Sequence, residues 1–133
     1  MIQVNYIAVL LAGISAMVVG SVWYGPLFGK TWMKLVGINK EDVKKSEMPK
    51  LYGIMFIGAL VESYILSIFI HYAGATTLIL GAKTGLWAGL GFVATTMLGN
   101  YMFAKRPMKL YYIDAGYALV NLVVMGAIIA SMW

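Results

Sequence analysis

Long apolar runs alternate with short polar segments along the chain, a pattern typical of a membrane protein. A membrane-spanning helix needs about 20 mostly apolar residues. Four stretches meet this length, at about residues 2–24, 51–72, 82–104 and 110–132. They predict an all-α, polytopic membrane protein in which residues 1–133 form a single four-helix transmembrane domain.

The composition supports the same class. Hydrophobic residues make up 62% of the chain, charged residues only 11%, and the mean hydropathy is +0.84. A soluble domain has about 25% charged residues, so this chain lacks the polar residues to cover a water-facing surface. The lipid bilayer is therefore the expected partner.

The basic residues are clustered on two of the three connections. Residues 25–50 carry six lysines, and residues 105–109 carry two lysines and one arginine, whereas Lys83 stands alone at the start of the third span. Under the positive-inside rule, both basic connections are cytoplasmic and the N- and C-termini lie outside. Basic residues that sit between apolar runs do not form a nucleic-acid-binding face.

The segment after the first span has the pattern of a short interfacial helix. Phe28 and Trp32 recur at helical spacing, while Lys30 and Lys34 fall elsewhere on the turn. An amphipathic helix of this kind lies in the membrane interface. We expect Lys30, Trp32 and Lys34 to contact lipid headgroups there.

Small residues recur every four positions on two of the spans. Helices associate in lipid through close packing, so such residues mark contact faces. The first span carries Ala8, Ala12, Ala16 and Gly20, and the third carries Gly81, Gly85 and Gly89. We expect both faces to be helix–helix contacts, within one chain or between protomers. On the third span the same face continues to Asn100.

Glu62 lies near the middle of the second span. A charged side chain there costs about 2.5–3.5 kcal/mol on insertion scales, so Glu62 must be protonated, paired or facing a wet cavity. One hypothesis is a carboxylate that handles a proton or cation. The other is a protonated Glu62 that hydrogen-bonds across helices, for instance to Asn121 at similar depth.

A second polar group is expected near the cytoplasmic side. Asp114 lies about one turn inside the fourth span, close in sequence to Lys105, Arg106 and Lys109. One interpretation is a near-interface ion pair or an orienting hydrogen bond. The other is a polar cluster of residues at similar depth, namely Trp23, Tyr24, Asn100, Asp114 and Tyr117.

The residues offer little for enzyme chemistry. The chain has no cysteine and one histidine, so no metal site is expected. Catalytic triad spacing, phosphate-binding loops and dinucleotide motifs are absent from the sequence, and no cofactor is expected. A membrane enzyme acting on a lipid would have only the group around Asp114 to use.

Two motifs resemble those of a known family. Trp23-Tyr24-Gly25-Pro26-Leu27-Phe28-Gly29-Lys30, followed by Trp32-Met33, and later Tyr111-Tyr112-Ile113-Asp114-Ala115-Gly116-Tyr117 are similar to segments of small prokaryotic four-span membrane proteins. That family is known only as a domain of unknown function. The resemblance covers nearly the whole chain and implies a multi-pass protein of a prokaryotic plasma membrane, without implying an activity.

Two functions remain open from the sequence. The first is a small transporter or ion- or proton-conducting protein, a homo-oligomer of two or more copies, with Glu62 as the binding carboxylate for a small solute or ion. The second is a non-catalytic membrane module that binds anionic lipid or a partner membrane protein. In the second, Lys30, Lys34, Lys44 and Lys45 would hold the headgroups.

Overall fold

The structure, a computed structural model, describes residues 2–42 and 44–133, and every regular element within them is helical. The α-helices are α1 (Tyr6–Val22), α2 (Gly29–Val36), α3 (Met48–Ala73), α4 (Leu78–Ala88), α5 (Thr95–Phe103) and α6 (Met108–Ser131). Two π-helical segments, η1 (Trp23–Leu27) and η4 (Gly89–Ala94), continue α1 and α4. Short 3-10 turns at Lys40–Asp42 and Lys45–Glu47 lead into α3.

Among the described residues, four helical segments are long and apolar enough to cross a membrane. They run Tyr6–Leu27, Lys45–Ala73, Leu78–Phe103 and Met108–Ser131. The predicted all-α fold with four candidate spans is therefore confirmed, and the chain is a multi-pass membrane protein. The second segment begins several residues earlier than the hydrophobic pattern indicates, because polar residues such as Lys50 are part of its helical end. The third begins at Leu78, where the Thr77 side chain caps the helix by accepting from the Leu80 amide.

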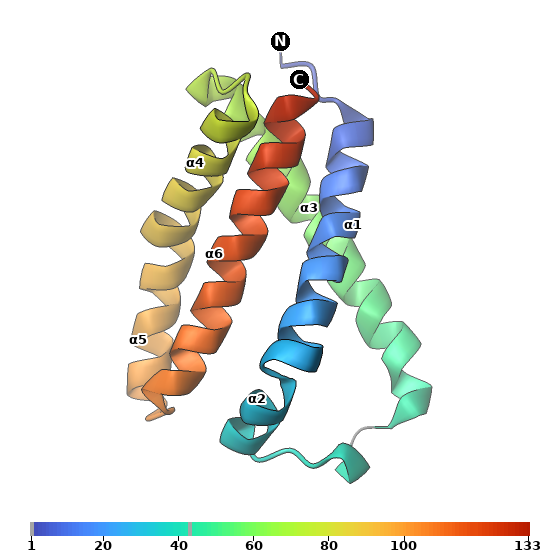
Figure 1. The fold of residues 1–133 in the computed structure, drawn as a ribbon, viewed down its shortest axis with the longest axis vertical. Coiled ribbons are helices and arrows are strands. Elements are labelled where there is room, and N and C mark those ends of the chain that lie inside the picture. The colour runs from blue at the N-terminus through green and yellow to red at the C-terminus, as the bar shows by residue number, and fades with distance from the viewer. Residues whose placement is uncertain (1, 43) are drawn as a thin grey trace.

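Figure 1 shows how the long helices are arranged. The continuous α4–α5 rod, α6 and α1 lie beside one another, and α3 crosses behind them at a slant. Helix α6 is central because it packs against both α4 and α1. Helix α3 lies close to α6 near the end that holds both chain termini and diverges from it at the opposite end of the bundle, the end where α2 lies. The hydrophobic core lies where these helices cross, and it consists mainly of side chains from α1, α3 and α6.

Small residues allow the close approach of these helices. Ala8, Ala12 and Ala16 are buried in α1. A Cβ atom on Gly81 or Gly85 would overlap backbone carbonyl groups of α6, those of Gly126 and Leu122 respectively. Two helix backbones can approach this closely only where side chains are absent from the contact.

Two further glycines, one on α1 and one at the start of η4, lie against side chains of α6. A Cβ atom on Gly20 would lie 3.3 Å from the Tyr117 hydroxyl oxygen, and one on Gly89 would lie 2.7 Å from a Leu119 methyl carbon. Both predicted small-residue faces thus lie against α6.

The first π-helical segment follows from proline. Pro26 has no N–H group, so an α-helical hydrogen bond to the carbonyl four residues earlier cannot form. The chain widens instead, and the Phe28 amide donates to the Trp23 carbonyl five residues back, at 2.9 Å. A Cβ atom on Gly29 would overlap the Tyr24 carbonyl, so glycine lets α2 start directly against the end of η1. Whether α2 lies in the membrane interface stays a prediction.

The second π-helical segment, η4, has a different cause. Gly89 and Gly91 weaken the α-helix, and the hydroxyl groups of Thr95 and Thr96 donate to the carbonyls of Gly91 and Phe92. On α6, the Tyr111 hydroxyl donates to the Ala94 carbonyl at 2.8 Å. These side-chain bonds satisfy carbonyl groups where the regular helical pattern is interrupted. A π turn holds one more residue than an α turn, so every later residue of the rod is displaced by one position around its axis.

Candidate functional site

Asp114 of α6 is the centre of a hydrogen-bonded cluster. Its Oδ1 atom accepts from the Tyr24 hydroxyl at 2.6 Å and from the Trp32 indole N–H at 3.1 Å. Its Oδ2 atom accepts from the Tyr101 hydroxyl. One carboxylate therefore joins η1, α2 and α5 to α6.

Trp23 and Tyr117 pack around this carboxylate without bonding to it. The Trp23 indole N–H donates to the Ile113 carbonyl at 2.9 Å, and its ring lies against Gly116. The Tyr117 ring meets the Tyr24 ring edge-on, with centroids 5.3 Å apart, and its hydroxyl donates to the Ala16 carbonyl at 3.3 Å. Four of the five residues of the expected cluster, Asp114 included, are thus brought together.

Asn100 is the exception. It is exposed and is not brought to Asp114, and the next residue, Tyr101, is buried and takes that place. The physical reason is η4. The prediction that Gly81 and Asn100 share one face assumes an unbroken α-helix. The extra residue in the π turn moves the inward-facing position from 100 to 101. The glycines and paired threonines of residues 89–96 were the available signal for that interruption.

Trp32 makes a contact that the sequence does not predict, because its indole N–H donates to Asp114. The reason is the π turn at η1, which folds α2 back under the end of α1, so that the Trp32 ring packs edge-on against Tyr24 with centroids 5.6 Å apart. The assignment of Trp32 to the membrane interface stays a prediction. Lys30 and Lys34 are exposed on the same short helix.

The Asp114 cluster is suited to holding helices together, because three other elements bond to one carboxylate on α6. Its hydrogen-bond donors in the described part of the chain are neutral hydroxyl and indole groups rather than the lysines and arginine near it in sequence. Arg106 instead lies over the Tyr101 ring, 5.5 Å from its centroid. Within the first interpretation, the orienting hydrogen bond describes Asp114 better than the ion pair, since three neutral protein donors bond to it.

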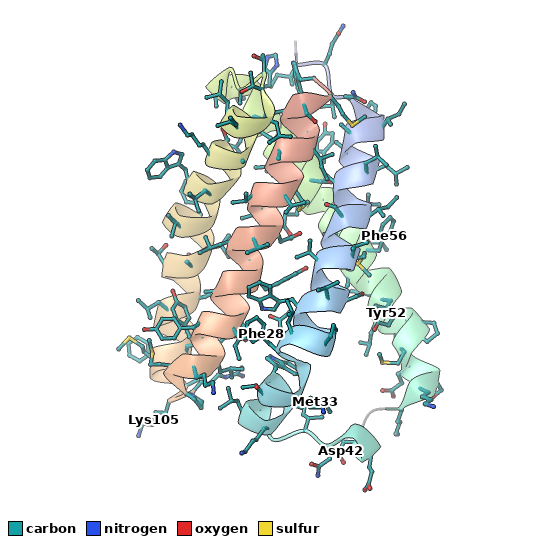
Figure 2. The ribbon with its side chains drawn as sticks, viewed as in Figure 1. Phe28, Met33, Asp42, Tyr52, Phe56 and Lys105 are labelled. Carbon is teal, nitrogen blue, oxygen red and sulfur yellow. The ribbon has the colours of Figure 1, made fainter. Side chains whose placement is uncertain are left out.

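A cavity of about 610 Å³ lies beside this cluster. Its walls come from the second half of α1, the first half of α3, α2 and α6. Met33 of α2 and Tyr52 of α3, both labelled in Figure 2, belong to its lining. The cavity lies where α3 diverges from α1 and α6 (Figure 1), and sequence reasoning missed it because no pattern in the chain states the angle between helices.

A second, smaller hollow of about 380 Å³ adjoins the cavity at α2 and the residues that follow it. It is lined by Lys30, Met33, Lys34, Gly37, Ile38 and Asn39. Gly37 ends α2 with a positive φ of 85°, a conformation that favours glycine. Met33 and Ile38 line both this hollow and the larger cavity.

Glu62 and Asn121 meet away from the cavity. The Asn121 side-chain amide donates to Glu62 Oε1 at 3.5 Å, a long contact. Asn121 is 3% exposed, and its Oδ1 atom has no hydrogen-bond partner in the part of the chain that the structure describes. Glu62 itself is exposed on the single chain. Along α6, Asn121 lies one turn beyond Tyr117, so the Glu62 contact follows the Asp114 cluster on the same helix.

Three comparisons with known proteins bear on this architecture. The family model described as "Protein of unknown function (DUF1761)" matches residues 7–130, nearly the whole chain. No curated protein and no solved structure gives a match. The match confirms the family resemblance indicated by the two sequence motifs, and it assigns no activity.

Proposed function

Since the chain belongs to this family of unknown function, we propose from its geometry that it is a small oligomeric transporter of protons or monovalent cations, with Glu62 as the binding group. The observation that carries the proposal is the Glu62–Asn121 contact. An exposed carboxylate at the middle of a 26-residue apolar helix lies beside a buried amide oxygen with no partner among the described residues.

The chemistry of these two groups suits a small cation. A carboxylate and an amide oxygen are hard oxygen ligands, and the side-chain amide of Asn121 can rotate to present either its oxygen or its NH₂ group. An ionisable residue inside a membrane-spanning helix is by default a candidate for an ion or proton pathway. Asn121 would then hold Glu62 when it is ionised and accept from it when it is protonated.

The exposure of Glu62 supports an oligomer. A carboxylate facing lipid tails is costly, so we expect a second copy of the chain, or water held between copies, to cover this side of α3. A pathway between protomers also removes the need for four helices to enclose a channel by themselves.

The test is ion flux in proteoliposomes. Proton entry is followed with an internal pH dye under a potassium diffusion potential, and sodium entry is followed with a radioactive tracer. We expect the unaltered protein to raise at least one flux several-fold over empty liposomes, and Glu62→Gln to return it to the empty level. Asn121→Leu should reduce it in part.

The matched control is Glu47→Gln, which makes the same chemical change in the connection before α3, where Glu47 is exposed. It should leave the flux unchanged. Flux that persists in Glu62→Gln, or an unaltered protein that conducts neither ion, would contradict the proposal.

A further inference from the structure

The 610 Å³ cavity has the shape and lining of a site for an apolar chain. Pockets that bury small ligands measure about 300–1,000 Å³. Four methionines, Met17, Met33, Met48 and Met55, are part of the lining. Methionine side chains are flexible and polarisable, so they adapt to an irregular or mobile apolar ligand.

The polar groups that the Asp114 cluster presents to this cavity are already engaged, and the lining adds only the hydroxyl groups of Ser21 and Tyr52. Asp114 accepts from Tyr24, Trp32 and Tyr101, and the Tyr117 hydroxyl donates to a backbone carbonyl. A ligand inside the cavity therefore meets mainly methyl, methylene, thioether and ring surfaces. This favours a hydrocarbon chain over a polar solute.

The adjoining 380 Å³ hollow is basic, in contrast to the apolar cavity. Lys30 and Lys34, one turn apart on α2, line it, and the two spaces share Met33 and Ile38. An apolar volume and a pair of ammonium groups thus adjoin at Met33 and Ile38. A ligand that reaches past Met33 would place its tail in one and an anionic group in the other.

We propose that this compound site binds an anionic phospholipid, with one acyl chain in the 610 Å³ cavity and the phosphate group on Lys30 and Lys34. Lysines near a membrane surface attract anionic lipid with about 1 kcal/mol each, and the acyl chain adds the burial of apolar surface. Glu62 does not line the cavity, so this site is separate from the proposed ion site.

The experiment measures contact between tryptophan and brominated lipid chains, which quench indole fluorescence on contact. Trp32 lines the cavity, whereas the other three tryptophans do not line it and are replaced by phenylalanine in all proteins used, namely Trp23, Trp87 and Trp133. The protein is reconstituted in phosphatidylcholine with a small fraction of brominated phosphatidylglycerol, and the mirror mixture uses brominated phosphatidylcholine in phosphatidylglycerol. We expect quenching by brominated phosphatidylglycerol to exceed its mole fraction several-fold.

Two pairs of variants separate the phosphate and acyl-chain contacts. Lys30→Gln with Lys34→Gln should remove the preference for phosphatidylglycerol, while Lys44→Gln with Lys45→Gln, an equal loss of charge outside both spaces, should preserve it. Gly25→Leu should reduce quenching by either lipid. Gly25 lines the cavity and a Cβ atom there meets nothing within 4 Å, so the leucine fills the space that the chain would take.

Gly53→Leu is the control for that filling, because Gly53 is also free of neighbours but lies outside the cavity. Equal quenching by the two brominated lipids would overturn the proposal. So would an equal effect of both lysine pairs, which would indicate attraction to the basic connection as a whole. Identical quenching in Gly25→Leu and Gly53→Leu would show that no chain enters the cavity, and loss of the preference on adding free glycerol phosphate would assign the site to a soluble anion.

Discussion

A single carboxylate holds four helical segments together at one end of the bundle. Asp114 accepts three hydrogen bonds, from η1, α2 and α5, at a level where the chain leaves the apolar core. An ionised acceptor forms stronger hydrogen bonds than a neutral one, and each donor here belongs to a different element. At the scale of the residue, Asp114 therefore determines how α2 and the α4–α5 rod meet α6.

Tyr101→Phe should lower the free energy of unfolding by about 1 kcal/mol. Hydrogen bonds between membrane helices average about 0.6 kcal/mol, and those to charged groups reach about 1.5–3 kcal/mol. The measurement is unfolding in mixed micelles of increasing SDS content. The matched control is Asn100→Ala, one residue earlier and exposed, which should change the value by less than about 0.5 kcal/mol.

A double-mutant cycle sharpens this test. In an Asp114→Asn background, Tyr101→Phe should cost much less than in the unaltered protein, because the charged acceptor is already gone. Equal costs in both backgrounds would show that the Tyr101 hydroxyl stabilises the bundle through some other contact.

At the scale of the element, the sequence predicts some of the helix contacts and misses others. The small residues of α1 and α4 recur every four positions, and that period holds as long as the helix is regular, so Ala12 and Gly85 are found at contacts from the pattern alone. The period fails beyond η4, where one extra residue moves Tyr101 inward instead of Asn100. Trp32 is missed for a related reason, since the π turn at Pro26 redirects α2 by an amount that no periodicity encodes.

Gly85→Ala should destabilise the bundle at the scale of the element. The added methyl would overlap the Leu122 carbonyl of α6, and overpacking of this kind costs about 1–3 kcal/mol. Gly99→Ala is the control because a Cβ atom there meets nothing within 4 Å, and alanine stabilises a regular helix by about 0.5–1 kcal/mol over glycine. Unfolding in mixed micelles should move in opposite directions for the two variants. A similar loss in both would argue against the close α4–α6 contact.

The π turn of η4 leads us to predict, at the scale of the element, different effects for two single-residue deletions in the α4–α5 rod. Deleting Gly91 removes the extra residue from the π segment and converts it into α-helix, so the residues after it keep their faces. Deleting Gly99 instead removes a residue from regular helix and turns the following residues by about 100° relative to those before it. Neither glycine has neighbours around its Cβ position, so the two deletions differ mainly in register.

The readout is again unfolding in mixed micelles, combined with Tyr101→Phe. The chain without Gly91 should retain most of its stability and still be sensitive to Tyr101→Phe. The chain without Gly99 should lose stability and that sensitivity. If both deletions are equally damaging, η4 does not act as a single inserted residue.

At the scale of the whole molecule, the basic and other polar residues are unequally distributed between the two ends of the bundle. The two chain termini and the α3–α4 connection lie at one end of the bundle, while α2 and the α5–α6 connection lie at the other (Figure 1). The second end holds nine of the ten basic residues, the Asp114 cluster and both hollows. If the positive-inside rule holds, the proposed lipid site faces the inner leaflet, whose anionic lipids match Lys30 and Lys34.

This orientation is testable because the chain contains no cysteine, so the unaltered protein gives no background with a membrane-impermeant maleimide. Lys44→Cys and Lys109→Cys place exposed thiols at the basic end, and Thr76→Cys places one at the other. In intact bacterial cells only Thr76→Cys should react, and the other two should react after the membrane is permeabilised. The opposite labelling would place Lys30 and Lys34 on the outer leaflet and remove the positive-inside argument. Two membrane crossings, Lys45–Ala73 and Leu78–Phe103, separate residues 44 and 109, so the four-span topology puts both residues on the same side. Reaction of Lys44→Cys and Lys109→Cys from different sides would therefore contradict that topology.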